Sequence, residues 1–233
     1  MLPEVDLRTV PALTEAQMRE VDRVMIEDLG IVLVQMMENA GRNLAELAIE
    51  RFRPGTVTVL AGTGGNGGGG LVAARHLANR GSKVGVVTAT APDRLGEVPR
   101  IQFEILRKMG VRFEADPPDA DLVIDALIGY SLRGDPRGRT AELIRWAKGR
   151  PVLSLDTPSG LNVTSGEAGD PCIDATATLA LALPKVGLLG ASQVGELYVA
   201  DISVPPSVYA AMGLRVPVLF REGTIVRLHK SAG

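Results

Sequence analysis

The sequence predicts an α/β fold in which a mainly parallel sheet lies between two layers of helices. Apolar runs of strand length alternate with helix-like stretches along most of the chain, an order typical of α/β proteins. Several of these runs, such as residues 122–128, are almost wholly apolar, as expected for parallel strands that are covered on both faces. A glycine-rich segment at residues 61–70 joins one strand to a helix. Such a turn is common where these sheets bind ligands.

Composition limits the classes of function. The chain has 233 residues, 45% hydrophobic and 22% charged, with a net charge of −2, so neither nucleic acid nor an anionic membrane is an expected partner. The only cysteine, Cys172, excludes an internal disulfide and suits a reducing compartment. One cysteine and two histidines cannot build an ordinary zinc site. No run reaches membrane-spanning length and the start lacks a secretory pattern, so we predict a cytoplasmic protein.

Residues 1–52 are predicted to be helical. Thr14 and Gln17 form a capping box for a first helix that ends at Gly30, and residues 31–52 form a second. The first helix has one apolar face, made by Met18, Val21, Met25 and Leu29.

Residues 56–233 are predicted to form the sheet core. The expected strands are residues 56–60, 83–90, 111–115, 122–129, 151–156, 175–182 and 197–202. The expected helices are residues 71–77, 96–109 and 139–148. Because no linker, repeat or low-complexity run divides the chain, we predict a single domain over residues 1–233.

The glycine segment has seven glycines in residues 61–70. It is predicted to be a turn whose glycines can accept positive φ angles and whose amides could approach a ligand closely. Gly62, Gly64 and Gly67 fit the dinucleotide fingerprint, but no P-loop lysine follows and the next strand lacks the acidic residue that binds ribose. On this pattern alone, a strand–helix turn without a ligand is an equally good interpretation.

Polar side chains also follow the apolar strands. Asn66 lies in the glycine segment, Asp125 near one strand end, and Asp156 and Ser159 at another. Since these ends meet at one edge of a parallel sheet, we expect a ligand site there. Each aspartate alone could be a turn or N-cap residue. Together these oxygen ligands suit a hard cation, and the few full charges favour a monovalent ion.

Six motifs, in order, resemble the NAD(P)H-hydrate epimerase family, also called the YjeF N-terminal domain. They are LTxxQM at 13–18, MENAGR at 37–42, the glycine segment with LVAARHL at 71–77, IDALIG at 124–129, SLDTPSGL at 154–161 and PKVGLL at 184–189. The resemblance implies a Rossmann-like three-layer sandwich, usually a homodimer. It also implies an enzyme that interconverts the R and S epimers of hydrated NADH and NADPH.

The resemblance further implies particular site residues. Asn66, Asp125 and Ser159 match the family's potassium ligands. The dinucleotide contacts match Gly65, Asn66, Gly67, Gly68, Gly69, Gly129, Tyr130, Ser131, Leu132, Arg133, Gly134, Asp135 and Asp156. We hypothesise that Asp156 protonates the departing hydroxyl and later activates water.

The glycine segment departs from the family pattern, because Gly65 and Gly69 stand where the family has Asn and Asp. The loop at residues 129–135 differs as well. A non-catalytic nucleotide-binding or scaffold module of the same fold therefore stays an alternative, and a conventional NAD dehydrogenase is a third. Some family members continue into a dehydratase domain, and residues 228–230 resemble that junction. A longer parent chain is thus another open alternative.

Overall fold

The computed structural model describes residues 2–230, whose strands form one sheet. Its order is β1-β9-β8-β7-β6-β5-β2-β3-β4, and neighbours run parallel except β8 and β9. The strands are β1 (Glu4–Asp6), β2 (Thr56–Ala61), β3 (Lys83–Thr88), β4 (Arg112–Phe113), β5 (Leu122–Ala126), β6 (Val152–Leu155), β7 (Ala177–Leu181), β8 (Glu196–Ala200) and β9 (Ile225–His229). The predicted mainly parallel sheet is confirmed.

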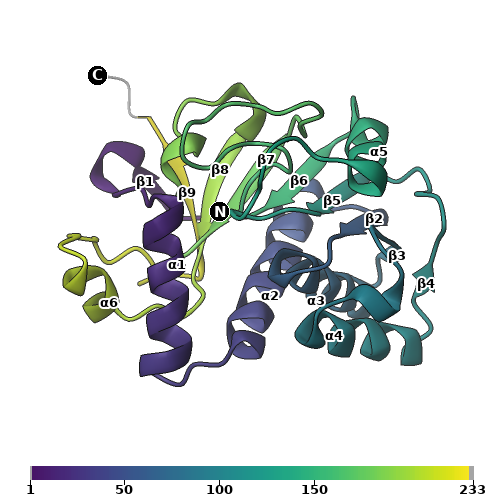
Figure 1. Cartoon of the computed structure of the whole chain (residues 1–233), viewed down its shortest axis with the longest axis horizontal. Helices are drawn as coiled ribbons and strands as arrows, with labels where there is room; N and C mark the ends of the chain where they lie inside the picture. Colours follow the sequence, from purple (N-terminus) through teal and green to yellow (C-terminus); the bar gives the residue numbers. More distant parts are fainter. Residues whose placement is uncertain (1, 231–233) are drawn as a thin grey trace.

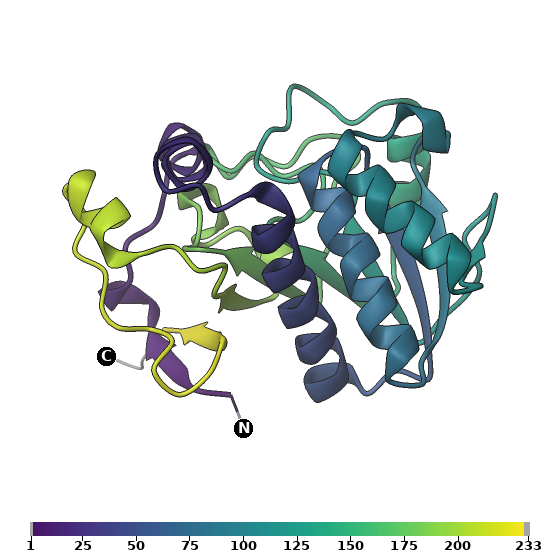
Figure 2. The same ribbon diagram turned by 90° about the horizontal axis from the view of Figure 1, so that it is seen from below.

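Helices cover both faces of this sheet (Figure 1). The principal helices are α1 (Glu15–Arg23), α2 (Leu33–Phe52), α3 (Gly65–Asn79), α4 (Glu97–Lys108), α5 (Gly138–Ala147) and α6 (Pro206–Ala211). Figure 2 shows α2, α3 and α4 side by side on one face, where Leu44, Leu71 and Leu106 join a core with the strands. Leu143 of α5 packs against Val123 in a separate core on the other face. The three-layer α/β fold predicted from the sequence is therefore confirmed.

The N-terminal helices begin close to where the sequence predicts. The capping box is present, since the Gln17 N–H donates to Thr14 Oγ1 and the Thr14 N–H donates to Gln17 Oε1. After α1 the chain makes a π-helical turn, Val24–Asp28, and then reverses at Gly30, whose φ is +70°. Turns of this π type are frequent near functional sites.

The glycine segment differs from its prediction, because α3 already begins at Gly65 rather than at residue 71. Glycines 65 and 67–70 are helical and have negative φ angles, so the predicted turn is wrong for these residues and the positive φ angles that glycine allows are not used there. A Cβ at Gly67 would lie 2.0 Å from the Gly62 carbonyl oxygen, and one at Gly70 would lie 2.5 Å from Ala126 Cβ. These glycines let the first turns of α3 pack directly against β2 and β5.

Gly67→Ala is expected to destabilise the fold by about 1–3 kcal/mol, because the new methyl group overlaps backbone that cannot easily move. Gly65→Ala is the matched control, since nothing lies within 4 Å of a Cβ there, and it should change stability by less than about 0.5 kcal/mol. Urea unfolding followed by circular dichroism measures both variants. Equal stability of the two would contradict the close packing described for Gly67.

Three elements were not predicted: β1, β9 and α6. β9 pairs antiparallel with β8 and parallel with β1, so it connects the two ends of the chain through the sheet. Within residues 2–230, no helix combines the length and the apolar character needed to cross a bilayer. The prediction of a single domain over residues 1–233 stays a prediction, although the described strands all share one sheet.

Candidate functional site

A cavity of about 540 Å³ opens at the carboxyl ends of the central strands. Parallel α/β sheets bind ligands at this edge. The residues that line it from the sheet side are Gly62, Thr63, Gly64, Gly65 and Asn66 after β2, Ala89 after β3, Leu127, Ile128, Gly129, Tyr130 and Ser131 after β5, Leu155 and Asp156 at the end of β6, and Leu181 of β7. The strand ends predicted to carry the site therefore do meet in one place.

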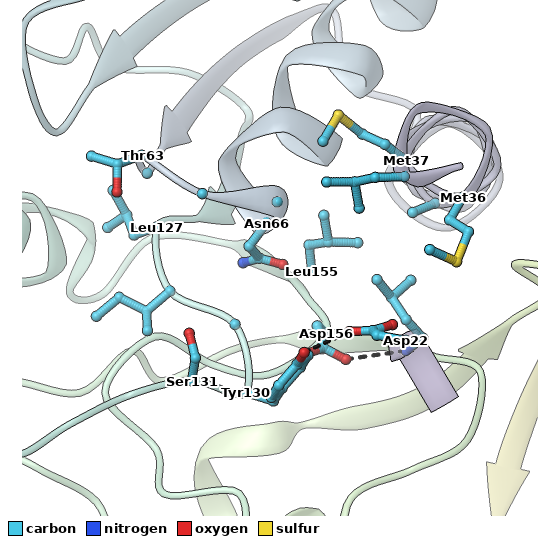
Figure 3. Close-up of a pocket in the computed structure, with 18 of the residues that line it drawn as sticks. Asp22, Met36, Met37, Thr63, Asn66, Leu127, Tyr130, Ser131, Leu155 and Asp156 are labelled. Atoms are coloured by element: carbon cyan, nitrogen blue, oxygen red, sulfur yellow. Dashed lines mark hydrogen bonds between the residues drawn. The ribbon is translucent and has the colours of Figure 1, made fainter. Parts of the chain in front are cut away.

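The N-terminal helices form the opposite, mostly apolar wall (Figure 3). Met36 and Met37 of α2 line the cavity, together with Ile26 from the π-helical turn and Leu33. The sequence suggests core packing for the two methionines, and both are indeed nearly buried. Their position adds a second role, because this wall can contact a planar apolar ligand such as a nucleotide base or a nicotinamide ring.

The predicted contact residues divide into two groups. The residues that line the cavity are Gly65, Asn66, Gly129, Tyr130, Ser131 and Asp156. Gly67, Gly68 and Gly69 are buried inside α3 and do not line the cavity. Leu132, Arg133, Gly134 and Asp135, farther along the second loop, do not line it either. The Asp135 carboxylate instead accepts a hydrogen bond from the Asp170 N–H at 3.1 Å.

Two of the predicted potassium ligands, Asp125 and Ser159, lie behind the cavity lining, where Ser159 Oγ accepts a hydrogen bond from the N–H of the lining residue Ile128 at 2.9 Å. Asp125 and Ser159 are fully buried, and Ser159 Oγ donates to Asp125 Oδ1 at 2.6 Å. The carboxylate also accepts from Ser154 Oγ and from the N–H groups of Ser159 and Leu127. Burial raises the pKa of Asp125, while these hydrogen bonds act in the opposite direction. Asn66 faces the cavity nearby, and its buried Nδ2 has no hydrogen-bond partner among the described residues.

Asp156 follows β6 in a strained backbone conformation, with φ at +67°. Its Oδ1 accepts a hydrogen bond from Nζ of Lys185, whose side chain is completely buried, and another from the Leu181 N–H at 3.3 Å. The lysine also donates to the Leu181 carbonyl oxygen at 2.9 Å. Lys185 and Asp156 therefore form an ion pair in the interior of the protein. The motif at residues 184–189 thus supplies the counter-charge of Asp156.

A second carboxyl group, on α1, reaches the same cavity. Asp22 Oδ2 accepts a hydrogen bond of 2.5 Å from the Tyr130 hydroxyl, as Figure 3 shows. Burial raises the pKa of Asp22, and the tyrosine hydrogen bond opposes the shift. Burial and the neighbouring Asp22 also raise the pKa of Tyr130. The Arg19 guanidinium lies 5.5 Å from the centre of the tyrosine ring.

Sequence reasoning missed Asp22 and the partner role of Lys185. A signal for Asp22 existed, because it is four residues after Met18 and so interrupts the predicted apolar face of the first helix. Met18 also lines the cavity. Within the described residues, no group of three or more histidine, cysteine, aspartate or glutamate side chains could hold a metal ion.

The motif order and the cavity agree with a match to a known family. A family model described as YjeF-related protein N-terminus matches residues 33–187, which include the cavity-lining residues that follow β2, β5 and β6. The chain belongs to this family. The resemblance stated from the sequence is therefore confirmed.

The curated relatives that match the chain fall into two groups, one of similar length and one of much longer proteins. A protein of Dehalogenimonas lykanthroporepellens named NAD(P)H-hydrate epimerase is 48% identical over 96% of this chain and 95% of its own length. A protein of the same name from Truepera radiovictrix is 39% identical, over 87% of this chain and 94% of its own. The bifunctional NAD(P)H-hydrate repair enzyme Nnr of Moorella thermoacetica is 38% identical over 85% of this chain. The match covers only 41% of that longer relative.

The fold also has a solved counterpart. The crystal structure of the yeast protein ynu0 superposes with a TM-score of 0.82, covering 94% of this chain and all of the yeast chain. At 23% sequence identity, this likeness supports the fold alone. It agrees with the Rossmann-like three-layer arrangement implied by the sequence motifs.

Proposed function

We propose that this family member is an NAD(P)H-hydrate epimerase, an isomerase that interconverts the R and S forms of hydrated NADH and NADPH. The observation that carries the proposal is the 48% identity to a relative of that name over 95% of the relative's length. The cavity supports it as well, because it has room for a nicotinamide nucleotide and contains carboxyl groups for proton transfer.

We place the phosphates of the dinucleotide at the start of α3. The first N–H groups of a helix lack intrahelical acceptors and favour anions, and Gly65 and Asn66 line the cavity at this point. The Gly68 N–H already donates to the Gly64 carbonyl oxygen at 3.0 Å, so it contributes less than the sequence suggests. Residues 129–131 would contact the ligand on its other side, with residues 132–135 at its far end.

The glycine at position 69 does not by itself argue against activity. A Cβ there would lie 2.6 Å from Leu155 Cδ2, in the interior of α3. An aspartate at this position would therefore meet Leu155 before it met a ligand. The absence of a carboxylate at position 69 therefore affects the packing between α3 and β6 rather than a contact with the ligand. The alternative of a non-catalytic module thus loses its main support.

We also propose that Asn66, Asp125 and Ser159 hold a potassium ion. The donor set fits, since it has oxygen atoms and only one full charge, which suits a monovalent rather than a divalent ion. The unpartnered amide of Asn66 fits too, because rotation of an amide by 180° exchanges its oxygen and nitrogen. When bound, the ion would supply positive charge beside the phosphates and the buried Asp125 carboxylate.

Asp125→Ala should abolish stabilisation by potassium, since it removes the only full negative charge of this set. We expect potassium to raise the unfolding temperature of the parent protein above its value in choline chloride of equal ionic strength. The variant should unfold at the same temperature in both salts. Asp174→Ala, at an exposed carboxyl group, is the control and should keep the potassium effect. A parent protein that is insensitive to potassium would contradict the site.

For the chemistry, we propose that Asp156 is a catalytic carboxyl group. Epimerisation requires loss and return of a hydroxyl group at a ring carbon whose neighbouring nitrogen can supply electrons. Protonation of the hydroxyl lets it depart as water, and the nitrogen lone pair then forms a double bond to the carbon. A carboxyl group that gives a proton to the oxygen and later accepts one from water can assist both steps. Lys185 would fix the position of Asp156 during these transfers.

The test is incubation of the purified chain with mixed R and S hydrates of NADH, each followed by chromatography. Starting from a mixture enriched in one epimer, the enzyme should restore the equilibrium ratio far faster than buffer does. Binding of the hydrates without faster interconversion would favour the nucleotide-binding module. If the chain neither binds the hydrates nor accelerates their interconversion, the proposed function is refuted.

Further proposals concern the compartment, the oligomeric state and the parent chain of the enzyme. We propose that it works in the cytoplasm, as its single cysteine suggests, and as a homodimer, as the family resemblance implies. Large apolar side chains at the corner between α1 and α2 support self-association, because Leu29 and Val32 are 47% and 48% exposed. Light scattering on the purified protein tests this. A dehydratase domain in a longer parent chain is proposed only by analogy with the bifunctional relatives.

A further inference from the structure

Epimerisation at one carbon requires proton transfer on both faces of the ring, which a single carboxyl group can serve only poorly. The proposed function, epimerisation of a hydrated nicotinamide ring, is the premise here. The cation left after loss of the hydroxyl is planar at the reacting carbon, so the hydroxyl departs from one face and water returns to the other. Each face then needs a group that can give a proton to oxygen or take one from it. The sequence identifies only Asp156.

The structure offers a second carboxyl group in the same cavity. Among the described residues that line it, the titratable side chains are Asp22, Tyr130 and Asp156. Asp22 comes from α1 and Asp156 from the end of β6, so the two carboxyl groups enter from different elements (Figure 3). The Tyr130 hydroxyl holds Asp22 through a hydrogen bond of 2.5 Å. A ring bound between α1 and the end of β6 would therefore be within reach of both.

The two carboxyl groups have opposite surroundings. Asp156 is paired with the buried amine of Lys185. Asp22 is half-buried against Tyr130 and, among residues 2–230, has no such counter-ion. Burial raises its pKa, and the Asp156 charge acts in the same direction, whereas Lys185, Arg19 and the tyrosine hydrogen bond act against it. Two carboxyl groups whose environments differ in this way are typical of an acid and a base in one site.

We propose that Asp22 is the second acid–base residue of the reaction and serves the ring face opposite to Asp156. For one epimer, protonated Asp22 gives its proton to the hydroxyl oxygen, the carbon–oxygen bond breaks, and water leaves with the bonding electron pair. The nitrogen lone pair fills the vacant orbital of the carbon. Water then attacks from the other face and loses a proton to Asp156. The reverse reaction, or proton exchange with solvent, restores the starting protonation states.

Tyr130 has a positioning role in this scheme. Its hydroxyl donates to Asp22 Oδ2, which leaves the other carboxyl oxygen to carry the proton toward the ligand. Tyr130→Phe should therefore lower kcat with little change in KM. A lowered kcat with normal folding separates this positioning role from a contribution to stability alone.

The experiment measures epimerisation and oxygen exchange in the same reaction, in water enriched in oxygen-18. In Asp22→Asn, epimerisation should fall by at least about 100-fold. Oxygen-18 should still enter one epimer faster than in enzyme-free buffer, because the hydroxyl can leave and return on the face served by Asp156. In Asp156→Asn the surviving exchange should favour the other epimer. Asp22→Glu should recover part of the epimerisation.

Asp28→Asn is the matched control, because Asp28 lies near Asp22 in sequence but pairs with Arg23 on the surface. It should epimerise at the parent rate. The inference is overturned if Asp22→Asn epimerises within about threefold of the parent, or if its epimerisation and oxygen exchange fall by the same factor. Failure of the parent itself to accelerate epimerisation would instead refute the proposed function.

Discussion

Asp156→Asn is expected to reduce the rate of epimerisation by at least about 100-fold, the lower range for loss of an acid–base group. The amide has nearly the shape of the carboxylate but cannot accept a proton from water. Because the substrate still fits the cavity, the dissociation constant for hydrated NADH should change much less than the rate. Calorimetric titration and chromatographic rate measurement on the same protein sample test both parts.

The control for this variant is Asp174→Asn, at an exposed carboxyl group outside the cavity, which should keep full activity. Circular dichroism must show that Asp156→Asn folds, since the change also leaves Lys185 without its carboxylate partner. A folded variant with parent-like epimerisation would remove Asp156 from the chemistry.

Lys185→Met should have the largest effect on stability. It leaves the buried Asp156 carboxylate without its counter-charge, a loss that costs about 3–5 kcal/mol when one partner of a buried ion pair is removed. The Leu181 carbonyl oxygen also loses a hydrogen bond from the lysine. The expected result is a lower urea midpoint with an unchanged slope, together with loss of epimerisation.

The double variant Lys185→Met/Asp156→Asn provides the matched comparison. With both charges gone, its stability should exceed that of Lys185→Met, because no unpaired carboxylate remains in the interior. Its activity should stay absent. If the double variant is less stable than Lys185→Met by the full effect of Asp156→Asn, the two side chains do not interact as the structure indicates.

Most of the sheet was predictable because its central strands are short apolar runs separated by glycine, proline and polar residues. β5 and β6 follow that pattern and were placed within a few residues of their observed ends. β9 was missed because Arg227 interrupts the apolar pattern of Ile225–His229 and because the strand pairs antiparallel with β8. Pairing of that kind depends on contacts that the local sequence does not reveal.

The start of α3 shows a limit of local propensity. Glycine disfavours helix by about 1 kcal/mol per residue relative to alanine, so a run of glycines predicts a loop. Close packing of this run against Gly62, Met37 and Ala126 outweighs that preference. The sequence holds the reason, since only glycine fits there, but the reason becomes visible only when the neighbouring elements are in place.

The site was predicted in part. Asn66, Asp125, Asp156 and Ser159 were recognised from strand ends and motifs. The structure places Asn66 and Asp156 in the cavity lining and joins Asp125 to Ser159 by a hydrogen bond. Asp22 was missed because its partner, Tyr130, lies 108 residues away in sequence. Hydrogen bonds between such distant residues follow from the packing of α1 over the sheet, which the pattern of a single helix does not specify.

The most direct test of the account is the approach to equilibrium from one purified epimer of hydrated NADH. With enzyme present, the other epimer should appear at a rate proportional to enzyme concentration and well above the rate in buffer. Asp156→Asn should lower that rate to near the buffer value. If the purified, folded parent binds the hydrate but the second epimer appears no faster than in buffer, the chain is not an epimerase.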